Sequence, residues 1–193
     1  MEKEIITAIA LGIGLSASTG FRVFLPLLIA GVAARLGFLP LTDSFSWLSG
    51  NTALISLGVA TVVEIGAYYI PFVDNLLDTI STPLAVGAGT LITASVLPAD
   101  SELVKWITSF IVGGGAAAAV QGGTAVLRLG STGTTAGTGN FLVSTGENIA
   151  AIVTPIVTIV IPIVIAILLL GTFFLIFRLF FKRKKRVASA EEG

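Results

Sequence analysis

The sequence predicts an all-α membrane protein, a polytopic bundle of about five transmembrane helices with several helices broken or kinked. Of the 193 residues, 54% are hydrophobic and only 11% are charged, against roughly 25% charged residues in a soluble domain. The mean hydropathy is +1.00. Several apolar runs reach about 20 residues, the length that crosses a bilayer core of roughly 30 Å. We therefore expect one transmembrane domain over residues 1–181 and a basic tail over residues 182–193.

Prolines and glycines interrupt most of the apolar segments. The first segment is too long for one straight span, since about 32 helical residues reach about 48 Å. Its glycines and serines and Arg22 favour a bend, a break, a steep tilt or a re-entrant hairpin. Pro71 ends the second segment, Pro83 interrupts the third, and the fifth carries Pro155 and Pro162. The segments span about 5–36, 52–70, 73–97, 102–129 and 149–181.

Small residues are dense in the first, third and fourth segments. Lipid supplies no hydrophobic drive between helices, so Gly, Ala, Ser and Thr favour association by letting two backbones approach closely. The spacing Gly114-x-x-x-Ala118 is typical of such contacts. We expect tight internal packing, with lining of a pore or contact with a second copy as the alternatives.

Residues 129–148, between the fourth and fifth segments, contain 12 Gly, Ser or Thr among 20 residues. This composition predicts an external loop or a re-entrant segment whose backbone groups coordinate an ion or an anionic group, as broken helices do in transporters. The segment lacks the Gly-x-x-x-x-Gly-Lys-[Ser/Thr] pattern of a nucleotide-binding loop. Glu147 then opens the fifth segment.

The chain has neither cysteine nor histidine. Disulfides, thiolate metal sites and Ser-His hydrolases are therefore excluded, and haem would lack its usual axial ligands. Only carboxylates, hydroxyls, Arg, Lys and backbone groups remain for chemistry. We expect no enzymatic activity, no metal and no cofactor.

A basic run follows the last apolar segment: Lys182, Arg183, Lys184, Lys185 and Arg186. The positive-inside rule predicts a cytoplasmic C-terminus, and the run is suited to contact anionic lipid and not nucleic acid. With five spans the N-terminus lies outside, and it lacks the basic region of a signal peptide, so we expect the first segment to remain in the mature protein. Three further bases then fall on the cytoplasmic side: Arg35, Lys105 and Arg178.

Two charges lie well inside apolar segments, Arg22 in the first and Glu64 in the second. A charge at the bilayer centre costs about 3 kcal/mol on insertion scales, so it is rarely kept without a partner or a watery cavity. One interpretation is that Arg22 and Glu64 pair with each other. The other is a cavity in which Glu64 binds a proton or cation and Arg22 anchors an anion.

Asp74 and Asp78 follow Pro71 at the expected start of the next helix. Their spacing of four places both carboxylates on one helical face. Helix capping is one interpretation, because carboxylates are favoured at a helix N-terminus. A cation site is the other.

The two halves of the chain resemble each other faintly. Arg22 and Arg128 each follow a run of small residues, and Glu64 and Glu147 each come seven or eight residues before a proline. An offset of three spans would make the halves an inverted repeat, which many secondary transporters contain.

Three ordered blocks resemble the bacterial membrane proteins grouped as domain-of-unknown-function family 4126. The first block covers residues 14–27, the second runs from Glu64 to Pro83, and the third runs from Arg128 to Glu147 and includes Asn140 and Ser144. This chain has Tyr68-Tyr69 where the family often has an acidic and a basic residue. The resemblance implies a common fold, a place in the bacterial inner membrane and the same polar residues, and it names no substrate.

We predict a small transporter or channel for an ion or small solute, acting as a homodimer or larger assembly because five helices enclose little cavity. The alternative is a lipid-binding or accessory membrane protein whose charges are structural pairs. In the transport hypothesis, carboxylates handle cations or protons and arginines handle counter-charge or an anionic group. The candidate residues are Arg22, Glu64, Asp74, Asp78, Arg128, Asn140 and Glu147.

Overall fold

The computed structural model describes residues 2–135 and 138–191, without the side chains at 2, 71–72, 74–76, 78–79, 163, 176 and 179–191. Every regular element in these ranges is helical, which confirms the all-α prediction. The elements are α1 (Glu2–Thr19), α2 (Phe24–Arg35), η1 (Asp43–Ser49), α3 (Asn51–Ala67), α4 (Pro71–Val96), α5 (Glu102–Ser109), η2 (Phe110–Gly114), α6 (Gly115–Thr135), α7 (Asn140–Val160) and α8 (Pro162–Glu191).

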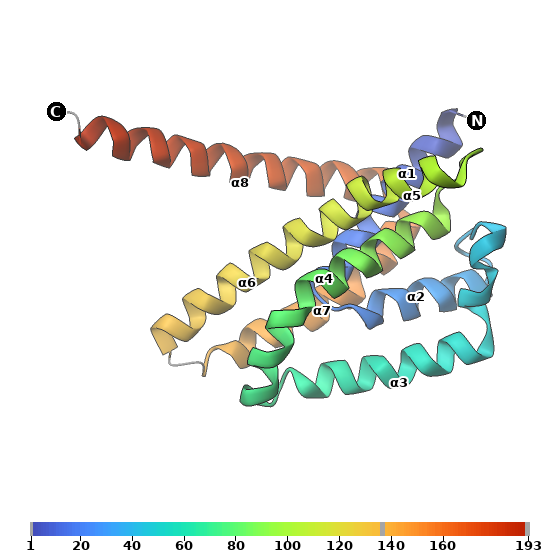
Figure 1. Cartoon of the computed structure of the whole chain (residues 1–193), viewed down its shortest axis with the longest axis horizontal. Helices are drawn as coiled ribbons and strands as arrows, with labels where there is room; N and C mark the ends of the chain where they lie inside the picture. The colour runs from blue at the N-terminus through green and yellow to red at the C-terminus, as the bar shows by residue number, and fades with distance from the viewer. Residues whose placement is uncertain (1, 136–137, 192–193) are drawn as a thin grey trace.

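Helix α1 is the centre of the bundle, and it packs against α4, α6, α7 and the start of α8 (Figure 1). Glycines in α1 and directly after it allow close approach on three sides. A Cβ added at Gly12 would lie 2.8 Å from Thr93 of α4, and one at Gly20 would lie 2.6 Å from the carbonyl oxygen of Ala117 in α6. Gly14 faces Thr158 of α7 in the same way. The predicted tight packing through small residues is confirmed at these contacts.

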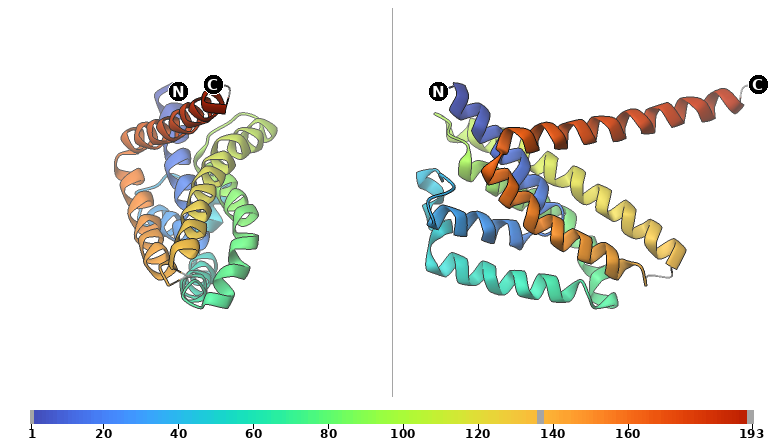
Figure 2. Two further views of the ribbon diagram at one scale, coloured as in Figure 1. Left: turned by 90° about the vertical axis from the view of Figure 1, so that its left-hand side faces the viewer. Right: turned by 180° about the vertical axis from the view of Figure 1, so that it is seen from behind.

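The first apolar segment is two helices and not one tilted span. Helix α1 ends at Thr19, the chain turns through residues 20–23, and α2 runs back toward the end of the molecule where α1 began (Figure 2). Val23 precedes α2, and its aliphatic side chain cannot accept a capping hydrogen bond from the helix. The N-terminus of α2 therefore depends on a partner from elsewhere in the fold.

The third segment is a single helix, contrary to the expected interruption. Helix α4 continues through Pro83 from Pro71 to Val96. Proline removes one backbone hydrogen bond, and neighbouring helices in a bundle can support the remaining turns. The packing of Gly89 against Gly113 of η2 gives α4 such a neighbour.

The described part of residues 129–148 is mostly helical, which differs from the expected external loop. Residues 129–135 complete α6, and residues 140–148 begin α7. The hydroxyl groups bond to carbonyls of the preceding turn, as Thr134 does to Gly130 at 2.9 Å and Thr135 does to Ser131 at 2.7 Å. A Ser/Thr-rich stretch can satisfy its polar side chains inside a helix in this way.

The fifth segment is divided, although we expected one span over residues 149–181. Helix α7 continues through Pro155 and ends at Val160, and α8 begins at Pro162. Ile161 between them has φ −136° and ψ 66°, outside the helical region, as expected for a residue that precedes proline. Helix α8 then extends beyond the rest of the bundle (Figure 1).

Two helices among the described residues are long and apolar enough to cross a membrane: Glu102–Thr135, which comprises α5, η2 and α6, and Asn140–Val160. The pair η1 and α3, bent by 60°, gives a third candidate if it acts as one span. The shorter apolar helices are Phe24–Arg35, Ile80–Val96 and Val164–Leu175. These lengths fit a helical membrane bundle, while the count of five spans is not confirmed.

The N-terminus, the end of α2 and helix α5 lie at one end of the molecule, and the far end of α8 lies at the other (Figures 1 and 2). Arg35 is the last residue of α2, and Lys105 is in α5. The structure therefore puts both at the opposite end from the far end of α8, whereas the sequence analysis expected them on one side of the membrane with the basic tail. That expectation assumed a single span in each of the two segments that the structure divides.

Candidate functional site

Buried charged side chains meet beside the break between α1 and α2. Arg22 lies in the break, Arg128 comes from α6 and Glu147 from α7. Their exposed fractions are 2%, 4% and 5%. We call these three residues the Arg–Glu cluster. The site joins parts of the chain more than 100 residues apart.

Arg22 donates a hydrogen bond from each nitrogen of its guanidinium. The Nε atom donates to Asn148 Oδ1 at 2.7 Å. The Nη1 atom donates to the Phe21 carbonyl and to Glu147 Oε2, each at 2.7 Å. The Nη2 atom donates to the Ser144 carbonyl at 3.2 Å. A buried charge is stable only when paired and hydrogen-bonded in this manner.

Glu147 holds the second arginine as well. Arg128 Nε donates to Glu147 Oε1 at 3.0 Å, and Arg128 Nη2 donates to Glu147 Oε2 and to Ser144 Oγ, the latter at 3.3 Å. The paired geometry of these bonds is the arrangement in which arginine binds a carboxylate most strongly. One carboxylate therefore links the α1–α2 break to α6 and α7.

The ring of Tyr68 contacts both guanidinium groups. The Arg22 Cζ atom lies 3.9 Å from the ring centroid, and the Arg128 Cζ atom lies 4.5 Å from it. Both distances are within the range of cation–π attraction, which strengthens when water is excluded. The next residue, Tyr69, accepts a hydrogen bond from Asn148 Nδ2 at 3.0 Å. The turn between α3 and α4 is thereby attached to the Arg–Glu cluster.

Glu64 binds the start of α2 instead of pairing with Arg22. Its Oε1 accepts from the Val23 N–H at 2.6 Å, and its Oε2 accepts from the Phe24 N–H at 3.0 Å. A carboxylate there satisfies otherwise unpaired donors and is favoured by the helix dipole. The predicted Arg22–Glu64 pair is thus replaced by an Arg22–Glu147 pair and a Glu64 cap on α2.

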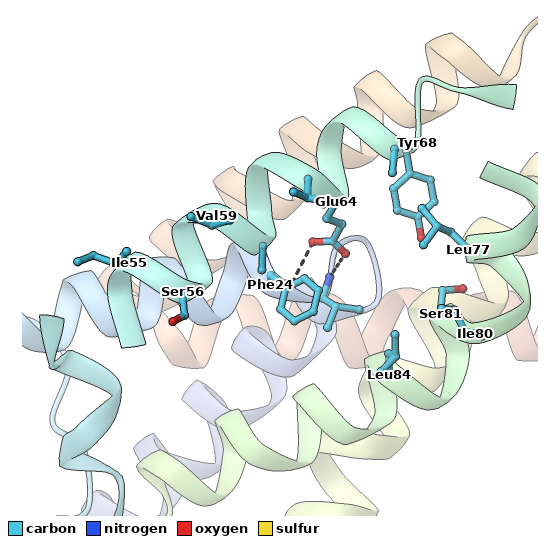
Figure 3. Close-up of a pocket in the computed structure, with 14 residues that line it drawn as sticks. Phe24, Ile55, Ser56, Val59, Glu64, Tyr68, Leu77, Ile80, Ser81 and Leu84 are labelled. Atoms are coloured by element: carbon cyan, nitrogen blue, oxygen red, sulfur yellow. Dashed lines mark hydrogen bonds between the residues drawn. The ribbon is translucent and has the colours of Figure 1, made fainter. Parts of the chain in front are cut away.

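A cavity of about 580 Å³ lies between α3 and α4 and reaches Glu64, as Figure 3 shows. We call it the α3–α4 cavity. Its walls are mainly aliphatic, and its described polar side chains are Ser56, Glu64, Tyr68 and Ser81. Ser81 also accepts a hydrogen bond from Gln121 of α6 at 2.7 Å. The cavity therefore combines an apolar body with a polar end at the break.

The structure brings Arg22, Arg128 and Glu147 together and places Glu64 beside them. Asn140 lies apart, at the start of α7, where its Nδ2 donates to Thr132 at 3.1 Å. Glu147 is two turns inside α7 and does not open a helix as expected. The side chains of two further candidates, Asp74 and Asp78, lie outside the described residues.

The candidate residues chosen from the sequence did not include Tyr68, Ser144 or Asn148, although Tyr68 and Ser144 lie in the blocks that carry the family resemblance. Ser144 precedes Glu147 by three residues, so helical periodicity would have placed both on one face had residues 140–148 been interpreted as helix. The sequence offered no signal for the position of Tyr68 between two arginines.

The described residues contain no group of three or more His, Cys, Asp or Glu side chains that could hold a metal ion. What they do contain is a set of hydrogen-bond acceptors and two guanidiniums. The two guanidiniums are paired with Glu147 and with further side-chain and backbone oxygens.

A protein-family model described as a domain of unknown function (DUF4126) matches residues 9–182. No curated protein matches the chain. No solved structure matches it either.

Proposed function

Since the chain belongs to the family described as a domain of unknown function (DUF4126), which names no activity, we propose that it is a small transporter or channel for an ion or small solute. The observation that carries this proposal is a buried Arg–Glu cluster at a helix break, next to a cavity that ends in a carboxylate. Charged groups inside a membrane bundle are costly and are typical of substrate and ion pathways. Broken helices at such a site are typical of secondary transporters.

The backbone at the break links the two carboxylates. Arg22 bonds to Glu147, and the next residue, Val23, bonds to Glu64 through its N–H. A cation or proton that neutralises Glu64 weakens its hydrogen bonds to α2 without breaking them, and the change reaches Arg22 through one peptide unit. In this proposal, Glu64 takes up the ion and the Arg–Glu cluster transmits its presence to α6 and α7.

Flux measurements in liposomes test the proposal. Purified protein would be reconstituted, and proton and ion flux would be recorded over a panel of cations and anions. We expect flux from the wild-type protein and none from a folded Glu64→Gln variant. The matched control is Asp100→Asn, an exposed carboxylate away from the cavity, and it should retain flux. Absence of flux in every condition, or flux that does not require Glu64, would overturn the assignment.

A second candidate is a lipid-binding or accessory protein whose charges are structural. The four hydrogen bonds that the buried Arg22 guanidinium donates favour it. If Arg22→Gln and Glu147→Gln each unfold the protein, a triple variant that also carries Arg128→Gln recovers the fold and no solute is transported, this candidate replaces the first. If the fold recovers and transport is retained, the protein is a transporter and the Arg–Glu cluster only supports its fold.

We further propose that the chain spans the bacterial inner membrane five times, with the basic tail cytoplasmic and in contact with anionic lipid and the N-terminus outside. The opposite positions of the N-terminus and the end of α8 support this orientation (Figure 1). We also propose a homo-oligomer, because a bundle of about five spans encloses little space. The protein is proposed to act without catalysis and without a cofactor. Labelling of single cysteines at residues 3 and 190, in a chain that has no cysteine of its own, tests the orientation.

A further inference from the structure

We propose that the α3–α4 cavity binds a lipophilic monovalent cation, with the Glu64 carboxylate as its counter-charge. This inference rests on the proposed function, because it names the substrate class for the same carboxylate. It concerns binding, which can be measured whether or not transport occurs.

The size and walls of the cavity fit an organic molecule better than a bare ion. Its volume of about 580 Å³ falls within the range of roughly 300–1,000 Å³ that is usual for small-molecule sites. Sodium or potassium would need several oxygen ligands to replace its hydration shell. The walls instead offer aliphatic side chains, which gain free energy by burying apolar surface. These wall residues include Ile55, Val59, Val63, Leu77, Ile80 and Leu84.

The charge that faces the cavity is negative. Glu64 is the charged side chain among the described lining residues, while Arg22 and Arg128 are held by Glu147 outside the lining. A carboxylate has about four lone-pair sites, and the Val23 and Phe24 N–H groups use two of them. Glu64 can therefore remain bound to α2 and still face a cation in the cavity (Figure 3).

The cavity is accessible from the outer surface of the bundle. Ile55 and Val59 of α3 are 67% and 61% exposed, and Ile80 and Leu84 of α4 are 46% and 43% exposed. In a membrane these faces contact lipid. A cation with an apolar body can reach the cavity through the bilayer, whereas a strongly hydrated ion cannot. Access through the bilayer and the negative charge of Glu64 therefore both favour a lipophilic cation.

The test uses two rigid ions of similar size and opposite charge, tetraphenylphosphonium and tetraphenylborate. The full-length protein would be placed in nanodiscs, and saturable binding would be measured above the background of empty nanodiscs. We expect saturable binding of tetraphenylphosphonium and none of tetraphenylborate. Glu64→Gln should weaken phosphonium binding by about tenfold or more, since a charge pair shielded from water contributes on that scale.

A pair of variants on α3 separates the cavity from the general stability of the helix. Val59 lines the cavity, whereas Val62, 72% exposed, lies on the same helix and is absent from the lining. Val59→Trp should abolish binding by filling the space, and Val62→Trp should leave it unchanged. Equal binding of both ions, or phosphonium binding unaffected by both Glu64→Gln and Val59→Trp, would overturn the inference.

The binding measurement and the flux measurement can each reject one proposal without rejecting the other. Saturable phosphonium binding without any flux would reject transport and keep the cation site. Flux of another ion through Glu64, with no phosphonium binding, would reject the cation site and keep transport.

Discussion

Glu64 and Glu147 are two buried carboxylates with opposite surroundings, although their partners Val23 and Arg22 are adjacent in the chain. Glu147 is enclosed by two arginines, and its bonds join the α1–α2 break to α6 and α7. Glu64 bonds only to backbone N–H groups among the described contacts and faces a cavity. Glu147 is 5% exposed and Glu64 is 8% exposed, so similar burial of two carboxylates does not imply similar roles. We assign the joining of the helices to Glu147 and ligand binding to Glu64.

The largest effect is expected from Glu147→Gln. Removing this charge leaves Arg22 and Arg128 without their shared carboxylate, and breaking a buried pair typically costs about 3–5 kcal/mol. Unfolding by a denaturing detergent would measure the loss. A cost below about 1 kcal/mol would show that Glu147 does not hold the bundle together.

Tyr68→Leu should have the next largest effect, a loss of about 2 kcal/mol, because it removes the ring that contacts both guanidiniums. Tyr68→Phe is the matched control, since it keeps the ring and should cost clearly less. The same unfolding assay compares the two. Equal losses would assign the effect to the hydroxyl and not to the cation–π contacts.

Glu64→Gln should cost only about 1 kcal/mol of stability. The amide oxygen still accepts one backbone hydrogen bond, and loss of a cap usually costs about 0.5–2 kcal/mol. The comparison with Glu147→Gln is the important result. If Glu64→Gln destabilises the protein as much as Glu147→Gln does, the division of roles between the two carboxylates is wrong.

The smallest effect is expected from Ser56→Ala, which changes an exposed hydroxyl at the mouth of the α3–α4 cavity. Surface substitutions of this kind usually change stability by no more than about 0.5 kcal/mol. A larger loss measured by the same detergent titration would mean that α3 is held by contacts other than those described.

Composition and apolar length were enough to predict the all-helical bundle and a first segment that is not one straight span. They could not locate the break in the last segment, because Pro155 and Pro162 look alike in sequence. Pro155 lies within α7, whereas Ile161 before Pro162 leaves the helical region. Local sequence does not show which proline the neighbouring helices support.

The sequence singled out the charged residues one by one, and the pair it suggested, Arg22 with Glu64, differs from the pairs that the structure shows. Arg22 was identified from the cost of charge in lipid and Arg128 from its position after a run of small residues. Glu147 was identified from its place at the start of the fifth segment, before a proline. The pairing of these three residues depends on α6 and α7 lying beside the α1–α2 break, and this arrangement is a feature of the tertiary structure that the local sequence does not show. The glycine- and threonine-rich composition of residues 129–148 concealed the helices that create it.

The most direct measurement is ion flux through liposomes that contain either the wild-type protein or Glu64→Gln, after both have been shown to fold. The account predicts flux from the wild-type protein and loss of flux from the variant, with little change in its unfolding transition. Equal flux from the two proteins would contradict the assignment of Glu64 as the ligand-binding carboxylate.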